Sequence, residues 1–378
     1  MVFGPRRSVV AQQGIRTPCP VYDLPRKPVH HPRRPEADAP FAHGAPCAPM
    51  TILLITHRSD NPSVDDVRAA IEARGERAWR LDTDRFPTDV RLAVNEGVDV
   101  PRATLEGPDG TLGLDEVTAV WWRRTSTGAA IPKDMEPQMR HACVEESTRT
   151  LQGMVAALDA FTVDPVSVIR RAEVKPLQLK VARAVGLEIP RTVTTNDPAT
   201  VRAFAKTCAN GMITKMLASF AIYDDAGKEN VVFTNPVSEA DLDDLDGLAL
   251  CPMTFQEKVD KRVELRVTVV GERVFAAQID SQRVARAQND WRREGNAMLD
   301  AWEPYDLPAP ITAALVRYMD HFGLTYGAAD LIVTPDGRHV FLECNPAGEW
   351  FWLAPKLPIA EALADVLTGR APHRGGRW

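Results

Sequence analysis

Two apolar segments near the C-terminus constrain the fold more than any other part of the chain. They flank the dipeptide Asp336-Gly337, which is favoured in two-residue type I′ hairpin turns. Counting outward from that loop places Asp330 directly opposite Glu343. Asn345 lies two residues beyond Glu343 and therefore projects from the same face of its strand. The sequence thus predicts an antiparallel hairpin that brings two carboxylates and an amide together.

This predicted group has a charge conflict that a cation would resolve. Two carboxylates directly opposite each other destabilise a sheet unless they share a proton or bind a positive ion. Carboxylate and amide oxygens are ligands that Mg²⁺ uses together with substrate phosphates. Asp330, Glu343 and Asn345 are therefore the candidate metal ligands. The alternative is a solvent-facing hairpin with incidental acids, because a register slip of one residue would separate the three side chains.

Between residues 50 and 165 the pattern is typical of an α/β domain. Residues 52–55 form a continuous apolar run, as in a strand that is buried on both faces. A helix is expected to follow, with Ser63 as its N-cap, and residues 77–81 alternate as a second strand. Strand, helix and strand in this order predict a βαβ unit.

The first 49 residues differ in composition from the rest of the chain. They hold 10 of the 30 prolines and are rich in arginine, a composition that does not support a packed core. We expect residues 1–49 to be either a disordered Pro/Arg-rich tail or a mis-assigned start, because Met50 directly precedes the first predicted strand.

Composition also excludes several classes of protein. The net charge of −6 argues against a nucleic-acid partner, and no apolar run reaches the length of a membrane span. The six cysteines show no CxxC spacing, as expected for reduced thiols of a cytoplasmic protein. Neither GxxxxGK[ST] nor GxGxxG occurs, so a nucleotide would have to bind without these loops.

The candidate metal ligands come last in a series of spaced motifs. The series resembles that of the ATP-grasp ligases and runs through Lys175, Lys215, Phe-Gln-Glu-Lys-Val at 255–259, Glu264-Leu265-Arg266, Asp330 and Glu343-Cys344-Asn345. The resemblance implies an α/β (α+β) ATP-grasp fold. Its parts are a Rossmann-like pre-ATP-grasp domain at 50–165 and an ATP-grasp domain at 166–370. In the latter, a lid at about 190–254 precedes a catalytic, antiparallel-sheet part at about 255–370.

The resemblance also implies a role for each of these residues, with ATP and Mg²⁺ as cofactors. Lys175 and Lys215 would contact the phosphates, and Glu264 would hold the ribose. The adenine hinge would comprise Gln256, Glu257, Lys258 and Val259, with Glu257 and the backbone of Val259 at the base edge.

One position departs from the ATP-grasp pattern. Many small-molecule ATP-grasp ligases carry an arginine two residues before the metal-binding aspartate, where this chain has Ala328. The positive charge that this arginine would supply could instead come from Arg266, Arg283 or Arg292. The catalytic residues implied on this basis are Arg266, Lys215 and Arg292.

Within the ATP-grasp ligases, the chain is most similar to the graspetide (microviridin-type) peptide synthetases. The similarity rests on short segments at 53–60, 80–87, 120–124, 290–292 and 345–350. It implies an ADP-forming ligase that phosphorylates Asp or Glu side chains of a ribosomal precursor peptide and then closes ester or amide macrocycles. It also implies a homodimer. Arg123 and Arg124 either face the peptide or have a structural role.

Two alternatives remain open from the sequence. One is an ATP-grasp ligase that adds free amino acids to a small molecule or to a protein C-terminus. The other is a nucleotide-binding protein without turnover. The ATP half of the site does not distinguish the two ligases.

Overall fold

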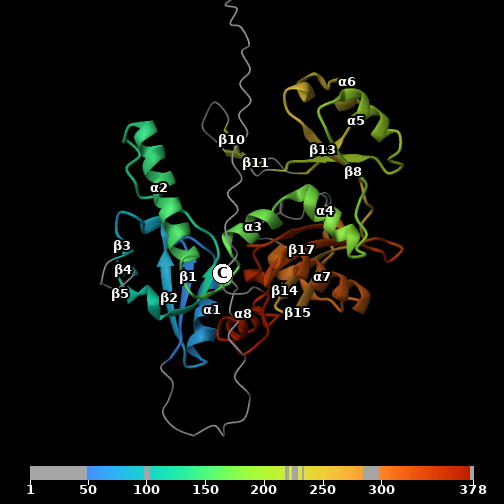
Figure 1. The fold of residues 1–378 in the computed structure, drawn as a ribbon. Coiled ribbons are helices and arrows are strands. Elements are labelled where there is room, and N and C mark those ends of the chain that lie inside the picture. Colours follow the sequence, from blue (N-terminus) through green and yellow to red (C-terminus); the bar gives the residue numbers. More distant parts are fainter. Residues whose placement is uncertain are drawn as a thin grey trace, which may run out of the picture. The chain divides into compact units, whose positions relative to one another are not determined.

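The computed structural model describes residues 49–97, 103–217, 221–223, 229–231, 234–283 and 298–374. The predicted tail, residues 1–49, lies outside the described residues except for Pro49. Residues 48–378 form one compact unit, which is described below (Figure 1). No helix among the described residues is long and apolar enough to cross a membrane.

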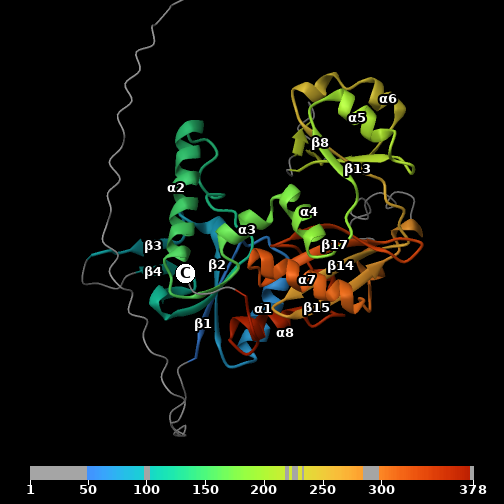
Figure 2. The same cartoon turned by 45° about the vertical axis from the view of Figure 1, so that its right-hand side comes forward.

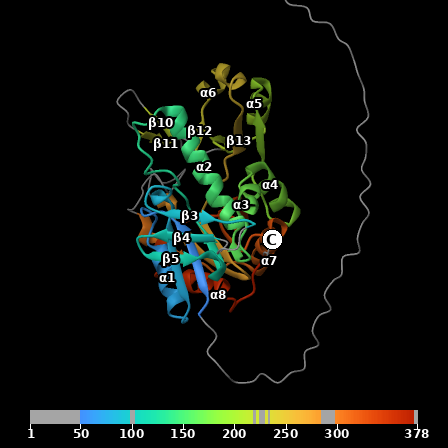
Figure 3. The same cartoon turned by 60° about the vertical axis from the view of Figure 1, so that its left-hand side comes forward.

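The N-terminal part is built on a parallel sheet, as predicted. Its four strands lie in the order β2-β1-β6-β7; their bounds are β1 Thr51–Thr56, β2 Arg77–Asp82, β6 Val117–Trp122 and β7 Phe161–Val163. Every residue of β1 is buried, which explains its continuous apolar run. A small antiparallel sheet lies beside it (Figure 3) and comprises β3 Arg91–Val94, β4 Ala103–Gly107 and β5 Gly110–Gly113.

The first helix, α1 (Ser63–Glu72), has a different start from the one expected. Ser63 is its first residue and not its N-cap; that position is taken by Pro62, which has no side-chain cap. The side chain of Asn61 performs the capping function instead, because its Oδ1 accepts a hydrogen bond from the Ser63 backbone N–H at 3.1 Å. The second N-terminal helix is α2 (Pro137–Ala156).

The middle of the chain forms an antiparallel sheet with two helices on one face (Figure 2). Its strands lie in the order β12-β9-β13-β8; their bounds are β8 Thr192–Thr195, β9 Met212–Lys215, β12 Asn235–Val237 and β13 Met253–Glu257. Helices α5 (Pro198–Ala205) and α6 (Glu239–Asp243) share an apolar cluster with this sheet. A short hairpin, β10 Ala221–Tyr223 and β11 Glu229–Val231, is also described.

The C-terminal part is a five-stranded antiparallel sheet in the order β16-β15-β14-β17-β18. The strands are β14 Val263–Val270, β15 Arg273–Ile279, β16 Glu303–Pro304, β17 Tyr326–Val333 and β18 His339–Asn345. Helices α3 (Val166–Ala172), α4 (Lys175–Ala184) and α7 (Ala309–Phe322) share one apolar cluster with odd-numbered residues of β14. Helix α8 (Ile359–Leu367) packs with Val270 on the opposite face and against α1 (Figure 2).

The predicted hairpin forms, but its turn differs from the prediction. Thr334 pairs with Arg338 through a backbone hydrogen bond of 2.9 Å, so the loop has three residues, and Gly337 takes φ +88°. A bulge at Leu342 then shifts the register, because Leu331 pairs with Phe341 whereas Asp330 pairs with Glu343. The extra loop residue and the bulge compensate for each other. The predicted opposition of Asp330 and Glu343 is therefore confirmed.

Candidate active site

The three candidate metal ligands, Asp330, Glu343 and Asn345, converge on one face of the β17–β18 hairpin. The amide nitrogen of Asn345 lies 3.4 Å from Asp330 Oδ2 and 3.3 Å from Glu343 Oε1. Exchanging the nitrogen and oxygen of this amide, which have nearly the same shape, gives an oxygen-only set. We call these residues the oxygen-ligand set. It fits Mg²⁺, which prefers oxygen donors and keeps positions for substrate. Among the described residues, no three His, Cys, Asp or Glu side chains group as metal ligands.

Two lysines place positive charge beside Glu343. Lys175 is the first residue of α4, and its Nζ lies 2.7 Å from Glu343 Oε2. Pro176 follows it in the first turn of α4, where proline is tolerated because the backbone N–H there has no partner within the helix. Lys215 ends β9. Burial raises the pKa of Glu343, but the charges of Lys175 and Lys215 outweigh it and lower that pKa to about 2.

Arg266 supplies a third positive charge from the neighbouring strand. It pairs with Asp330 across β14 and β17, and its Nη1 lies 3.1 Å from Asp330 Oδ1. The guanidinium also lies over the Trp352 ring, 5.5 Å from the centroid. Burial and stacking on this ring restrict the conformations of the Arg266 side chain. It therefore loses less conformational entropy on binding a ligand than a solvent-exposed arginine would. Each acid of the oxygen-ligand set thus has its own cation.

The predicted hinge residues lie at the end of β13 and just beyond it. Gln256 is buried and donates from Nε2 to Thr192 Oγ1 at 2.9 Å. Glu257 accepts hydrogen bonds from the backbone N–H and the Nε of Arg191, at 2.8 and 2.7 Å. Both of its oxygens are therefore held by Arg191, so its main chain is better placed than its side chain to meet a base edge. Lys258 is tied to Gly211 through its backbone N–H.

The Glu264 carboxylate is held by two groups beside the hinge. Its Oε1 accepts from Lys261 Nζ at 2.8 Å and from Ser281 Oγ at 2.5 Å. Strand alternation puts Glu264 and Arg266 on the face opposite Leu265, which packs against the helices. Glu264 and Arg266 therefore project from the same face of β14, and both line the pocket described next.

A single pocket brings most of the predicted residues together. Of the twelve predicted, ten line it: Lys215, Gln256, Glu257, Lys258, Val259, Glu264, Arg266, Asp330, Glu343 and Asn345. Lys175 lines the adjoining cavity, which shares Lys215 and Leu342 with the first. Arg292 lies outside the described residues, as does the side chain of Arg283.

Gln178, which fixes β18 to α4, was not among the residues predicted from the sequence. Its side chain is buried, and its Oε1 accepts from the backbone N–H of Cys344 at 3.0 Å. Its Nε2 donates to the carbonyl oxygens of Cys344 and Ala172, at 2.8 and 2.6 Å. Cys344 lies between two candidate metal ligands, Glu343 and Asn345, so Gln178 positions both. The available signal was a glutamine on the apolar face of a helix, three residues after Lys175.

Comparisons with known proteins agree with this geometry. Residues 51–170 match the family model of the MvdD pre-ATP grasp domain. The chain is 46% identical to the macrocyclase MdnC of Microcystis aeruginosa, solved with the precursor peptide MdnA. That match covers 85% of this chain and 100% of MdnC, with a TM-score of 0.77. No curated protein matches the chain.

Two further solved structures are similar. A RiPP-associated ATP-grasp ligase of Chryseobacterium gregarium, in complex with ADP and a leader and core peptide, is 38% identical, with a TM-score of 0.83 and coverage of 87% and 99%. The macrocyclase MdnB of Microcystis aeruginosa is 34% identical, with a TM-score of 0.70 and coverage of 84% and 99%. The chain therefore belongs to the RiPP-associated ATP-grasp ligases, the family of the graspetide macrocyclases.

Proposed function

We propose that this enzyme uses ATP to activate Asp or Glu side chains of a ribosomal precursor peptide and closes ester or amide macrocycles within that peptide. The observation that carries the proposal is the single pocket in which the hinge, Lys215, Arg266 and the oxygen-ligand set meet. Its relatives MdnC and the Chryseobacterium ligase were solved with peptides bound, which supports a peptide as the substrate.

The reaction has two steps. An oxygen of the peptide carboxylate attacks the γ-phosphorus of ATP, and the bond to ADP breaks, leaving an acyl phosphate. A Ser or Thr hydroxyl, or a Lys amine, of the same peptide then attacks the acyl carbon. Phosphate leaves and the nucleophile loses a proton, so each ring costs the peptide one water.

The residues of the pocket suit phosphoryl transfer, which depends on positioning and charge neutralisation. ATP and Mg²⁺ are the cofactors, and the oxygen-ligand set would hold Mg²⁺, which neutralises phosphate charge when bound. Lys175, Lys215 and Arg266 hold the phosphates and offset their remaining charge. Glu264 holds the ribose, and the 256–259 segment holds the base. Arg292 is proposed to supply a further positive charge that faces the peptide.

We also propose the division into a pre-ATP-grasp domain at 50–165 and an ATP-grasp domain at 166–370, with the lid at about 190–254. The enzyme is proposed to act in the cytoplasm as a homodimer, without nucleic-acid or membrane partners. The described cysteines, Cys143, Cys208, Cys251 and Cys344, are all free thiols, which supports a reducing compartment. Light scattering of the purified chain measures the oligomeric state.

The test uses the enzyme with ATP, Mg²⁺ and the small Thr/Asp/Glu-rich peptide encoded nearest to its gene. Loss of one or more waters from the peptide, measured by mass spectrometry, is the expected result. Hydroxylamine then separates esters, which it cleaves, from amides. A gain of mass with added free amino acids would favour the alternative ligase, and ATP binding without ADP formation would favour a protein without turnover.

A further inference from the structure

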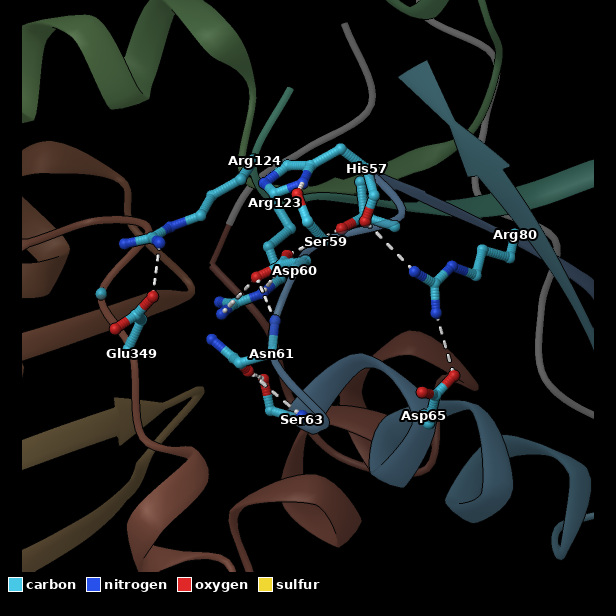
Figure 4. A network of polar contacts seen from close by, with 12 residues as sticks. His57, Ser59, Asp60, Asn61, Ser63, Asp65, Arg80, Arg123, Arg124 and Glu349 are labelled. Atoms are coloured by element: carbon cyan, nitrogen blue, oxygen red, sulfur yellow. Dashed lines mark hydrogen bonds and ion pairs between the residues drawn. The ribbon is translucent and has the colours of Figure 1, made fainter. Parts of the chain in front are cut away.

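An ion pair joins the N-terminal part, which holds the parallel sheet, to the C-terminal part, close to the oxygen-ligand set. Arg124 follows β6 at the carboxyl edge of the parallel sheet, and its Nη1 contacts Glu349 Oε1 (Figure 4). Both side chains are partly exposed, at 43% and 31%. In open α/β sheets, ligands bind in the crevice at the carboxyl ends of the strands. The pair therefore lies where such a sheet offers a binding site.

The loop that carries Glu349 is anchored by the contacts of Gly348 to the β17–β18 hairpin. Gly348 donates from its backbone N–H to the carbonyl of Asn345 at 3.1 Å, and its own carbonyl accepts from the Tyr326 hydroxyl at 2.6 Å. A Cβ at Gly348 would lie 2.6 Å from the Cβ of Ala328, so only glycine fits there. The carboxylate of Glu349 is thus held four residues beyond a metal ligand, on an anchored loop.

A second, buried arginine lies next to this ion pair. Arg123 is 3% exposed, and its Nε lies 3.0 Å from Asp60 Oδ2. Its Nη1 and the Nδ2 of Asn61 are buried and have no hydrogen-bond partner among the described residues. Figure 4 shows both groups pointing to the side on which Glu349 lies. Arg123 thus places a second guanidinium, closed to solvent, beside the residue that pairs with Glu349.

Arginine charges from the N-terminal and the C-terminal parts both reach Tyr326. Burial raises the pKa of Tyr326, while the charges of Arg123, Arg266 and Arg124 oppose that rise. Tyr326 donates to the Gly348 carbonyl, so these charges act next to the loop that carries Glu349. Arg266 in turn contacts Asp330 of the oxygen-ligand set.

We propose that Arg124 binds the peptide carboxylate that is to be phosphorylated, and that Glu349 occupies this place until the peptide enters. The inference rests on the proposed function and assigns its substrate-carboxylate site. Glu349 carries the same functional group as the Asp or Glu side chain of the substrate, so the two compete for one guanidinium. The buried Arg123–Asp60 pair positions the strand end from which Arg124 projects.

The test compares a precursor peptide with its variant in which the acceptor Asp and Glu residues are replaced by Asn and Gln. Calorimetry measures binding of both peptides, and mass spectrometry measures water loss from the first. Wild-type enzyme should bind the acidic peptide about tenfold more tightly or better, as expected for a charge-assisted hydrogen bond. Arg124→Gln should abolish this preference and leave the KM for ATP unchanged.

Two further variants make the test specific. Glu349→Gln removes the competitor and should strengthen binding of the acidic peptide several-fold. Arg68→Gln, which breaks an exposed pair with Glu72 on α1, should change neither binding nor water loss. Thermal unfolding of each variant checks that it is folded.

The outcomes separate this inference from the proposed function. A wild-type enzyme that removes no water from the peptide overturns both. Water loss by the wild type, together with a preference for the acidic peptide that survives Arg124→Gln, overturns the role of Arg124 alone. Weaker binding of the acidic peptide to Glu349→Gln overturns the role of Glu349 as a competitor.

Discussion

Two regions of this enzyme pair arginine with aspartate, and they differ in how far they are closed to solvent. At the edge of the parallel sheet, the side chains of Arg123 and Asp60 are each 1% exposed. On the antiparallel sheet, Arg266 is 9% exposed, but its partner Asp330 is 27% exposed and lines the pocket. The residue types are the same, so the difference in burial separates a structural ion pair from one that can bind a ligand.

Removal of the acids on the open side should have the largest effect. Asp330→Ala combined with Glu343→Ala removes both carboxylates of the oxygen-ligand set, and activity should fall about a thousandfold or more because phosphate charge is no longer neutralised. Water loss from the precursor peptide measures it. A double variant that retains a tenth of the wild-type rate would show that these acids are incidental.

Asp60→Asn on the closed side should act on stability. It leaves the charge of Arg123 buried without a counter-ion, which should lower the free energy of unfolding by about 3–5 kcal/mol. Urea denaturation measures the loss. The matched control is Glu72→Gln in the exposed Arg68–Glu72 pair, which should change the free energy by less than about 1 kcal/mol.

If Asp60→Asn left the free energy of unfolding unchanged but removed the activity, the distinction between the structural Arg123–Asp60 pair and the ligand-binding Arg266–Asp330 pair would be wrong. In that case the Arg123–Asp60 pair, and not only its exposed neighbours, would belong to the reacting site.

Gln178→Leu should weaken both stability and activity, because it leaves backbone groups of Cys344 and Ala172 without partners. The expected loss is about 1–3 kcal/mol in the free energy of unfolding. A positioning role further predicts that kcat falls while the KM for ATP changes little. Gln178→Glu keeps one acceptor for the Cys344 N–H and should recover part of the kcat. A kcat equal to that of the wild type in Gln178→Leu would show that Gln178 serves packing alone.

Lys175→Met should give the smallest effect, seen in the pH dependence of stability. The folded-state pKa of Glu343 is lowered from 4.5 to about 2, so its ionised form stabilises the fold above pH 4.5. That contribution is lost as the pH falls toward 2. Without Lys175 the pKa of Glu343 should rise by about one unit or more, and the loss of stability between pH 4.5 and 2 should become shallower.

Denaturant melts at several pH values measure this slope, with Lys133→Met, at an exposed position of the N-terminal part, as the control. Equal slopes in the Lys175 variant and the wild type would show that the Lys175–Glu343 pair contributes nothing to the pKa of Glu343.

The parallel strands and the acidic hairpin could be predicted because each carries its own local pattern. The run at 52–55 and the alternation at 77–81 became β1 and β2. The opposition of Asp330 and Glu343 was predicted correctly although the turn was not, since the three-residue loop and the bulge at Leu342 compensate for each other. Neither deviation is visible in the residues themselves, because Asp-Gly suits both loop lengths.

Interactions across long sequence separations could not be predicted. Gln178 bridges α4 and β18 across 166 residues, and Glu349 contacts Arg124 across 225 residues. Local patterns carry no information on such partners, which depend on how the sheets and helices pack. The same limit explains Glu257, whose carboxylate is held by Arg191. From the sequence alone this glutamate was expected at the base edge.

The most direct test of macrocycle formation is the mass of the precursor peptide after incubation with the full chain, ATP and Mg²⁺. We expect the loss of one water for each ring closed, with one ADP formed per water and no loss in the Asp330→Ala, Glu343→Ala variant. An unchanged peptide mass while the wild-type enzyme forms ADP would contradict the proposed function.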